Sequence, residues 1–526
     1  MKKLTTFDNS AEANNSPEAV IAKLEQENKE LQNSLIEKNT EIQALKFKAE
    51  KLEHQLQKAL LQLYGSKADK AKNPDEPSTF DEPELTSDTT AEELEQADEE
   101  LTIPEHKRKK PKRKPLPKNL PRKEVIHDLP DSQKFCKCGN SLTHICDEDS
   151  EQLEYIPAQV TVIVNKRKKY ACKSCEETIK LAPLPKMPIP KSIATASLLA
   201  TVLIAKYCDH LPLYRQEQIW QRYGVDIPRQ TMCNWVIKCA KLLAGIVVAM
   251  KSNILASNYA RADETTVQVL KEEGRKATDK SYMWIFMTGL KTNNNIVFEY
   301  HATRASVAAT EFFTGFKGYL QTDAYGGYNT LRKNNDIVNV GCMAHCRRNF
   351  TDITKVVKKA GKAHEALKYI RALYKIEEQI KEDDFDKGYQ YRLEHATPLL
   401  DKFKIWLEKS IVHVPPKNPL AQAINYAVNH WSELTRYLDN GMLEIDNNWC
   451  ENQIRPFALG RRNWLFAGNV TGAWASSVIY SIVVTAKANG LNPWKYLVDV
   501  LTKAPYCETE EDFAKLIPKP GYFGSG

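Results

Sequence analysis

Residues 258–270, NYARADETTVQVL, begin the part of the chain that decides the fold. Two further strand-like runs follow, SYMWIFMTGL at 281–290 and NNIVFEYHAT at 294–303, with a turn between them. Apolar and β-branched residues dominate these runs, which predicts successive strands. A helical pattern at 304–316 and two more strand-like runs, KGYLQTD and DIVNVGC within 317–342, come next. We therefore expect a sheet of five strands with a helix between the third and the fourth.

The length and composition indicate a multidomain α+β protein. A chain of 526 residues is too long for one domain of ordinary size. No apolar run reaches the roughly 18 residues that a membrane span needs, so we expect no span. The N-terminus, MKKLTTFDNSAEANN, lacks the apolar region of a signal peptide. A cytoplasmic location follows from these two expectations.

Charge is segregated along the chain rather than large. The net charge is +7, but an acidic stretch at 75–105 is followed by a Lys- and Arg-rich stretch at 107–123. A basic segment of this kind is suited to a polyanion such as DNA. The alternative is a solvated linker with no binding role.

The N-terminal part carries a heptad pattern. Across residues 17–64, leucines such as Leu24 and Leu31 occupy d positions and Asn28 occupies an a position. This predicts a coiled coil and hence a homo-oligomer, with one long helix packed on its own protein as the alternative. Residues 65–124 are rich in Pro, Asp, Glu and Lys, which predicts a disordered charged linker.

Residues 125–183 contain two close cysteine pairs on either side of a strand-rich segment. The expected zinc ligands are Cys136, Cys138, Cys172 and Cys175. Four thiolates at such spacing are typical of a tetrahedral Zn²⁺ site in a zinc-ribbon-like hairpin. The first pair is spaced C-x-C rather than C-x-x-C, so Cys146 is a candidate substitute ligand. Buried thiols without metal are the alternative.

Residues 184–252 are expected to be helical. Two helical patterns are separated by YGVDIP, in which Gly224 suits a helix C-terminus and Pro228 suits a helix start. This arrangement predicts a helix-turn-helix whose second helix, residues 229–241, reads the major groove of DNA. A plain helical hairpin is the alternative.

Three acidic residues far apart in the chain are candidate metal ligands: Asp263, Asp323 and Glu451. Hard divalent cations prefer oxygen ligands, and two such ions can promote phosphodiester chemistry. Glu264 is a poor substitute for its neighbour, because side chains alternate along a strand. Asp446 is expected to cap the helix that holds Glu451. For Glu451, a surface salt bridge to Arg455, four residues on, is the alternative.

Four motifs occur in a characteristic order. They are DET from Asp263, DAYGGY from Asp323, GCMAHCRR at 341–348 and DNNWCENQIRPFALGRRNWLFAG at 446–468. From about residue 20 to about 505, the chain resembles the large transposase of the insertion-sequence sixty-six family, a group of DDE transposases. Asn452 and Met343 depart from the residues usual in that family, Arg and Trp.

The resemblance implies a ribonuclease-H-like catalytic core at 253–470, an all-helical insertion at about 352–440, and a C-terminal helical region at 471–526. Asp263, Asp323 and Glu451 would be the catalytic triad and would bind Mg²⁺ or Mn²⁺. The family also favours DNA contacts by a set of basic, polar and aromatic residues. These are Lys166, Arg167, Arg229, Asn234, His345, Arg348, Arg455, Arg461, Arg462 and Trp464.

The resulting hypothesis is a transposase that cleaves and joins DNA strands at the ends of an insertion sequence. Its expected partners are transposon-end and target DNA, a second copy of the chain, and accessory proteins of the same element; its expected place is the nucleoid. The Arg461–Trp464 segment has a second interpretation, a loop anchored by a buried tryptophan. The rival hypothesis is a non-catalytic, zinc-bearing, coiled-coil DNA-binding regulator with a decayed nuclease fold.

Overall fold

The computed structural model describes residues 160–171, 179–356, 361–380 and 384–524, with isolated positions between 21 and 38. The expected linker and the expected zinc ligands lie outside the described residues, as does nearly all of the expected coiled coil. The chain divides into two compact units, residues 77–183 and residues 1–76 with 184–526.

The described part of the smaller unit is a short hairpin. Strands β1 (Lys169–Ala171) and β2 (Ile179–Leu181) pair antiparallel. Arg167 Nε donates to the carbonyl of Ala182 at 2.7 Å and extends the pairing beyond the strands. Residues 160–168 of the stretch expected to be strand-rich form no strand, and β1 covers only its last described residues.

A mixed sheet forms the centre of the larger unit. Its strands are β3 (Tyr259–Lys271), β4 (Lys280–Thr288), β5 (Ile296–His301), β6 (Gly318–Gln321) and β7 (Ile337–Val340). They lie in the order β5-β4-β3-β6-β7. The first three pair antiparallel, and β6 and β7 add in parallel beside β3. The expected order of strands, with a helix before the fourth, is confirmed.

A sixth strand, β8 (Ala467–Asn469), pairs in parallel with the distal end of β3. The sequence predicts no strand here, because three residues that include Gly468 carry no alternation pattern. The chain reaches β3 by a sharp change of direction at Leu465, which has a positive φ of 61°. A non-glycine residue in this conformation is uncommon and needs support from its surroundings.

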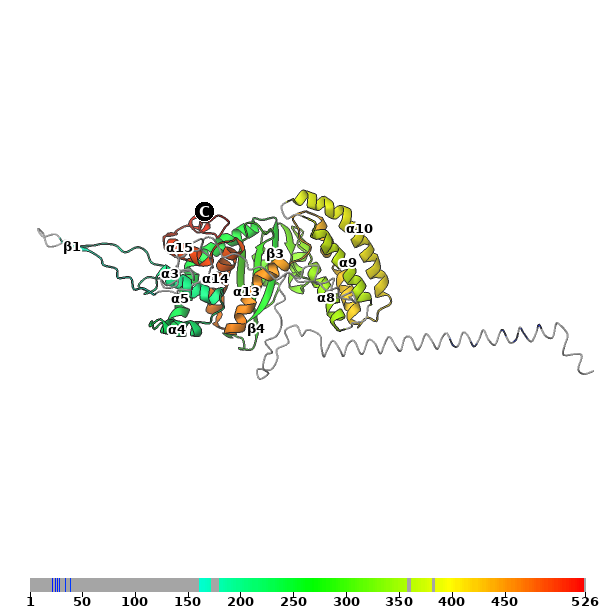
Figure 1. The fold of residues 1–526 in the computed structure, drawn as a ribbon, viewed down its shortest axis with the longest axis horizontal. Helices are drawn as coiled ribbons and strands as arrows, with labels where there is room; N and C mark the ends of the chain where they lie inside the picture. Colours follow the sequence, from blue (N-terminus) through cyan, green and yellow to red (C-terminus); the bar gives the residue numbers. More distant parts are fainter. Residues whose placement is uncertain are drawn as a thin grey trace, which may run out of the picture. The chain divides into compact units, whose positions relative to one another are not determined.

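Helices cover the sheet and share one hydrophobic core with it (Figure 1). They include α3 (Ala196–Tyr207), α4 (Leu213–Arg222), α5 (Arg229–Leu255), α14 (Val470–Ala488) and α15 (Pro493–Lys503). Helix α14 also satisfies the backbone of the edge strand β5. Ser481 Oγ accepts the N–H of Phe298 at 2.8 Å, and Thr485 Oγ1 accepts that of Ile296 at 3.1 Å. An edge strand covered in this way is closed to pairing with another chain.

Helices α4 and α5 confirm the expected turn between two helices. Gly224 adopts a positive φ of 75° just after α4, and Pro228 is the N-cap of α5. Helix α5 continues well past the expected end at residue 241, because apolar residues at helical spacing, such as Ile246 and Met250, are buried in the core. Among the described residues, α5 alone has the length and composition to cross a membrane; packing inside the core explains its apolar character.

A group of helices between β7 and α13 has a hydrophobic core of its own and lies beside the sheet (Figure 1). Its members are α8 (Met343–Val356), α9 (Lys362–Glu377), α10 (Phe385–Ile411), α11 (Pro419–Asn429) and α12 (Trp431–Thr435). The described part of the expected insertion is therefore all helical.

The remaining helices and turns complete the described residues. These are α6 (Val307–Phe312), α7 (Asn329–Arg332), α13 (Asn448–Trp464) and α16 (Glu510–Ala514), with the 3-10 turns η2 (Gly326–Tyr328), η3 (Arg436–Leu438) and η4 (Ala504–Tyr506). Helix α13 carries Glu451 in its first turn and packs against β3.

Candidate active site

Strands β3 and β6 bring two of the predicted carboxylates to one level of the sheet. The strands pair in parallel with Arg261 opposite Gln321. Asp263 and Asp323 each follow one of these paired residues by two positions. Because neighbouring strands lie about 5 Å apart, the two aspartates are neighbours in space although β4, β5 and α6 separate them in the chain.

The pKa of Asp263 reflects the acidic groups around it. Burial is the main effect that raises the pKa of Asp263 well above its usual value. The negative charges of Glu264, Glu451 and Asp323 raise it further. A carboxyl group in this position needs a proton or a bound cation to offset the negative charge of its neighbours.

Glu264 makes a separate set of contacts. Its buried side chain forms an ion pair with Arg304, whose Nε lies 2.7 Å from Oε1. Tyr328 donates its hydroxyl to Oε2 at 2.8 Å. Burial and the charge of Asp323 raise the pKa of Glu264, while Arg304 opposes this change. These contacts give Glu264 a structural role, as expected from alternation along the strand.

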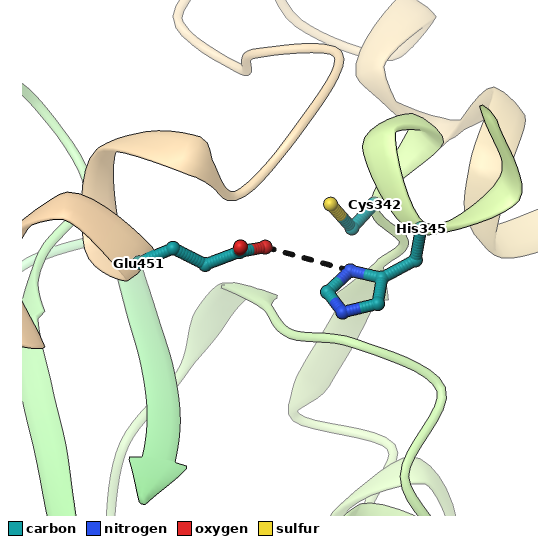
Figure 2. Close-up of side chains that lie close together, drawn as sticks. All are labelled: Cys342, His345 and Glu451. Atoms are coloured by element: carbon teal, nitrogen blue, oxygen red, sulfur yellow. Dashed lines mark ion pairs between the residues drawn. The ribbon is translucent and has the colours of Figure 1, made fainter. Parts of the chain in front are cut away.

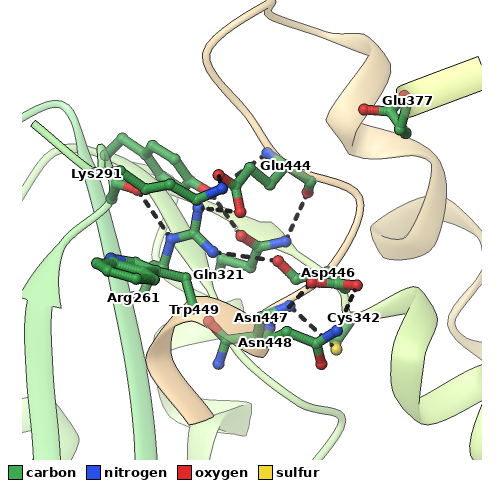
Figure 3. Close-up of polar contacts among 12 residues, drawn as sticks. Arg261, Lys291, Gln321, Cys342, Glu377, Glu444, Asp446, Asn447, Asn448 and Trp449 are labelled. Carbon is green, nitrogen blue, oxygen red and sulfur yellow. Dashed lines mark hydrogen bonds and ion pairs between the residues drawn. The ribbon is translucent and has the colours of Figure 1, made fainter. Parts of the chain in front are cut away.

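The residue two positions before each aspartate holds the chain that leads into α13 (Figure 3). Arg261 is fully buried, and its Nη1 donates to the carbonyl of Asp446 at 3.2 Å while Nη2 lies 3.0 Å from the Glu444 carboxylate. Gln321 donates to the carbonyl of Glu444 at 2.7 Å. The two strands that carry the aspartates thus set the start of the helix that carries Glu451.

The start of α13 differs by one residue from the expectation. The N-cap is Asn447, not Asp446. Asn447 Nδ2 donates to the carbonyl of Ala262 at 3.0 Å, which ties the cap to β3. Asp446 still accepts the N–H of Asn448 at 3.0 Å, but its other oxygen accepts the hydroxyl of Tyr374 at 2.7 Å. Tyr374 lies on α9 in the helical group. The sequence near Asp446 does not reveal this partner, which accounts for the difference.

Glu451 lies between two residues of the GCMAHCRR motif. Arg348 Nη2 is 3.2 Å from Oε2, and His345 Nδ1 is 3.5 Å from Oε1. Among the described residues, one group of acidic, histidine and cysteine side chains lies close enough to share a metal ion (Figure 2). Its members are Glu451, His345 and Cys342, whose ligand atoms all lie within 4.8 Å of one another. Asp263 and Asp323 are not members of this trio.

Cys342 is the residue that we did not expect at the site. The sequence places it among scattered cysteines, which we expect to be reduced core thiols. Its spacing from His345 was a usable signal, because two residues three apart at a helix start share a face. What the sequence does not reveal is that Glu451 meets this face.

Comparison with known proteins identifies the family. The family model described as Transposase IS66 family matches residues 191–475, a range that contains the sheet, the helical group and all three predicted carboxylates. The chain belongs to the IS66 transposase family. A model for the IS66 C-terminal element matches residues 481–518, from within α14 to beyond α16.

Two further IS66 matches fall before the sheet. The zinc-finger binding domain of transposase IS66 matches residues 133–176, which include the four cysteines expected to bind zinc. The model described as Transposase C of IS166 homeodomain matches residues 51–125, across the end of the expected coiled coil and the expected linker. The IS66 matches imply DNA as a partner, together with zinc and divalent-metal use.

Relatives of comparable length share most of the chain. The uncharacterized protein y4jD of Sinorhizobium fredii is 31% identical over 399 residues, which cover 74% of this chain and 78% of the relative. The uncharacterized protein y4qI of the same organism is 30% identical over 434 residues, which cover 79% and 80%. The names of these relatives give no activity, so the chemistry of this IS66 family member must be inferred from its own residues.

The residues predicted to contact DNA lie in different settings. Arg461 Nη1 bonds to Thr265 Oγ1 at 3.1 Å and to the carbonyl of Thr266, which ties the end of α13 to β3. Trp464 packs edge-on against Phe457 with ring centroids 5.4 Å apart. The interpretation of this segment as a loop anchored by a buried tryptophan is wrong, because residues 461–464 form the last turn of α13 and Trp464 is only partly buried. Arg462 is exposed beside it.

Five other predicted DNA contacts are exposed. Arg229 and Asn234 lie on the first turns of α5, and Arg455 lies on α13. Lys166 and Arg167 are exposed beside the β1–β2 hairpin of the smaller unit. Exposure puts these five side chains within reach of phosphates, and their roles stay predictions.

Proposed function

We propose that this IS66 family member is a DDE transposase that cleaves and joins DNA strands with divalent metal held by Asp263, Asp323 and Glu451. The observation that carries the proposal is the β3–β6 register, which sets Asp263 beside Asp323, together with the effect of the negative charges of Asp323 and Glu451 on Asp263. Their cluster is suited to Mg²⁺ or Mn²⁺, since oxygen-rich sites favour hard cations. The strand order supports a ribonuclease-H-like catalytic core.

Bound divalent ions would activate a water or a 3′-hydroxyl and stabilise the leaving oxygen of a phosphodiester. The chain's own residues prepare that site. Asp263 releases its proton when a cation offsets the surrounding negative charge. Arg261 and Gln321 hold the start of α13, so that Glu451 stays beside the two aspartates.

We assign the remaining parts to DNA capture and assembly. Cys136, Cys138, Cys172 and Cys175 would bind Zn²⁺ in the smaller unit, and Lys166 of the same unit would contact phosphates. The exposed start of α5 would contact element ends, and the coiled coil at 17–64 would pair two copies of the chain. Accessory proteins of the same element and a cytoplasmic, nucleoid-associated location complete the proposal.

The proposed domain limits give these parts their extents. The smaller unit supports a zinc module at 125–183, and α3 to α5 support a DNA-binding region at 184–252. The sheet with its helical insertion supports a catalytic core at 253–470. Helix α14 packs into the same hydrophobic core, so the region 471–526 would fold together with the catalytic core rather than alone.

The test uses the full chain, a duplex that carries an element end, and Mg²⁺. Asp263→Ala should retain end binding and lose strand cleavage and strand transfer. Asp336→Asn, which changes an exposed acid of the same sheet paired with Lys317, should retain both activities. Full activity in Asp263→Ala would overturn the proposal. End binding without cleavage in the wild-type chain would favour the DNA-binding regulator.

A further inference from the structure

The start of α8 and the start of α13 meet at three side chains of different chemistry (Figure 2). Cys342 and His345 come from the beginning of α8, and Glu451 comes from the first turn of α13. Their sulfur, nitrogen and oxygen atoms all lie within 4.8 Å of one another. Small side-chain rotations would bring such atoms to the distances of a shared ion, about 2.0–2.3 Å from each ligand.

The hydrogen bonding of the trio leaves ligand atoms unused. His345 Nδ1 and Glu451 Oε1 are shielded from solvent and lie 3.5 Å apart, a contact that is an ion pair when the imidazole is protonated, and neither atom has a hydrogen-bond partner. Shielded polar atoms are normally paired, because an unpaired one costs roughly 1–3 kcal/mol. A cation bound between two such atoms would therefore give each of them a partner.

The sulfur is oriented by the chain that leads into α13. Asn447 donates its backbone N–H to Cys342 Sγ at 3.2 Å, and Asn447 is itself tied to β3 through Ala262. This contact fixes the position of the sulfur. Burial raises the pKa of the Cys342 thiol, so a bound cation would have to displace its proton, because cysteine binds metal as the thiolate. Arg348 contacts only the other oxygen of Glu451, so Oε1 stays available.

We propose that Cys342, His345 and Glu451 bind a borderline-soft divalent cation of the Zn²⁺ class, with a fourth position open to water. A thiolate, an imidazole and a carboxylate match the donors that such ions select, whereas Mg²⁺ selects oxygen alone. The ion would hold Glu451 on the α8 side and withdraw it from Asp263 and Asp323. This regulatory part rests on the proposed function; the binding part does not.

The binding part is tested with Co²⁺ as a spectroscopic probe on the full chain. Wild type should bind one more equivalent than Cys342→Ala, with a loss of thiolate-to-cobalt absorption in the variant. Cys346→Ala removes a buried thiol one turn along α8 and should behave as wild type. The four cysteines of the smaller unit are the same in all three proteins, so their contribution cancels.

His345→Gln gives a second route if Cys342→Ala fails to fold, because its side chain is 25% exposed. Its affinity for the extra Co²⁺ should fall about 10- to 100-fold. Equal Co²⁺ binding by wild type, Cys342→Ala and His345→Gln would overturn the site.

The regulatory part is tested by Zn²⁺ inhibition of Mg²⁺-dependent cleavage. Half-inhibition of Cys342→Ser should need about 10-fold more Zn²⁺ than wild type, while Cys346→Ser should match wild type. Equal inhibition of wild type and Cys342→Ser would overturn the regulation and leave the binding result in force. Absence of Mg²⁺-dependent cleavage in wild type would instead count against the proposed function, and the Co²⁺ result would still decide the site.

Discussion

Two polar clusters meet at the start of α13, and they differ in how their atoms are paired. The frame cluster consists of Arg261, Gln321, Glu444 and Asp446, and the ligand cluster consists of Asp263, Cys342, His345 and Glu451. In the frame cluster, the buried guanidinium contacts a carboxylate and two carbonyls (Figure 3). In the ligand cluster, His345 Nδ1 and Glu451 Oε1 face each other at 3.5 Å without a hydrogen bond, and the Asp263 carboxyl has a strongly raised pKa.

The difference separates residues that stabilise the fold from residues that would bind a cation. A buried charge with every side compensated is costly to disturb, since its loss leaves several partners unpaired. Carboxylates that repel one another destabilise the fold until a cation binds. Substitutions should therefore reduce stability in the frame cluster, whereas substitutions of the two carboxylates in the ligand cluster should leave it unchanged or raise it.

The largest effect is expected for Arg261→Met. It removes the partners of Glu444 and of the carbonyls of Gly289 and Asp446, so the free energy of unfolding should fall by about 3–5 kcal/mol. Chemical denaturation of the larger unit measures the change. Arg462→Met, an exposed arginine on α13, is the control and should unfold like wild type. A loss below about 1 kcal/mol for Arg261→Met would contradict the stabilising role of the frame cluster.

A smaller loss is expected for Gln321→Leu. The amide donates to the carbonyls of Glu444 and Gly341 at 2.7 and 3.2 Å, and leucine leaves both acceptors unpaired in a buried place. The free energy of unfolding should fall by about 1–3 kcal/mol. Gln268→Leu is the matched control on an exposed position of β3. A similar small loss in both variants would show that Gln321 does not help to hold α13.

Asp263→Asn should have the opposite sign. Burial raises the pKa of Asp263 in the folded state above its usual value of 3.8, so wild-type stability falls as pH rises from about 4 through the folded-state pKa. Asparagine carries no charge and so removes this loss of stability. The loss is about 1.4 kcal/mol for each unit by which the folded-state pKa of Asp263 exceeds its unfolded-state pKa. Melting temperatures without divalent metal should be higher for the variant at pH 7 and should converge with those of wild type near pH 4. Lower stability of the variant at pH 7 would contradict the assignment of Asp263 to the ligand cluster.

The smallest effect is expected for Glu451→Gln. The substitution weakens the contact with Arg348, whose side chain is 53% exposed, and relieves repulsion with Asp263. Partly exposed ion pairs contribute about 0–1 kcal/mol, so stability without metal should change by less than about 1 kcal/mol. Cleavage of an element end should nevertheless be lost. Unfolding that is as severe as in Arg261→Met would place Glu451 in the frame cluster.

The sequence predicted the order of strands and helices because that information is local. Strand-like runs such as SYMWIFMTGL, and the turn signals at Gly224 and Pro228, depend on residues within a few positions of each other. The motifs around Asp263, Asp323 and Glu451 pointed to the family for a similar reason, since each is a continuous stretch. Strand β8 escaped prediction because it is short and gains its pairing only from β3.

By itself the sequence determined the strand and helix pattern, the acidic candidates and their motifs. Only the tertiary structure decided which polar residues support the fold and which ones bring possible metal-ligand atoms together. Arg261 looks like any strand residue until β6 and the chain before α13 enclose it, and Cys342 looks like a core thiol until Glu451 reaches it. Burial and pairing depend on contacts between segments that are distant in the chain, and local patterns carry no record of those contacts.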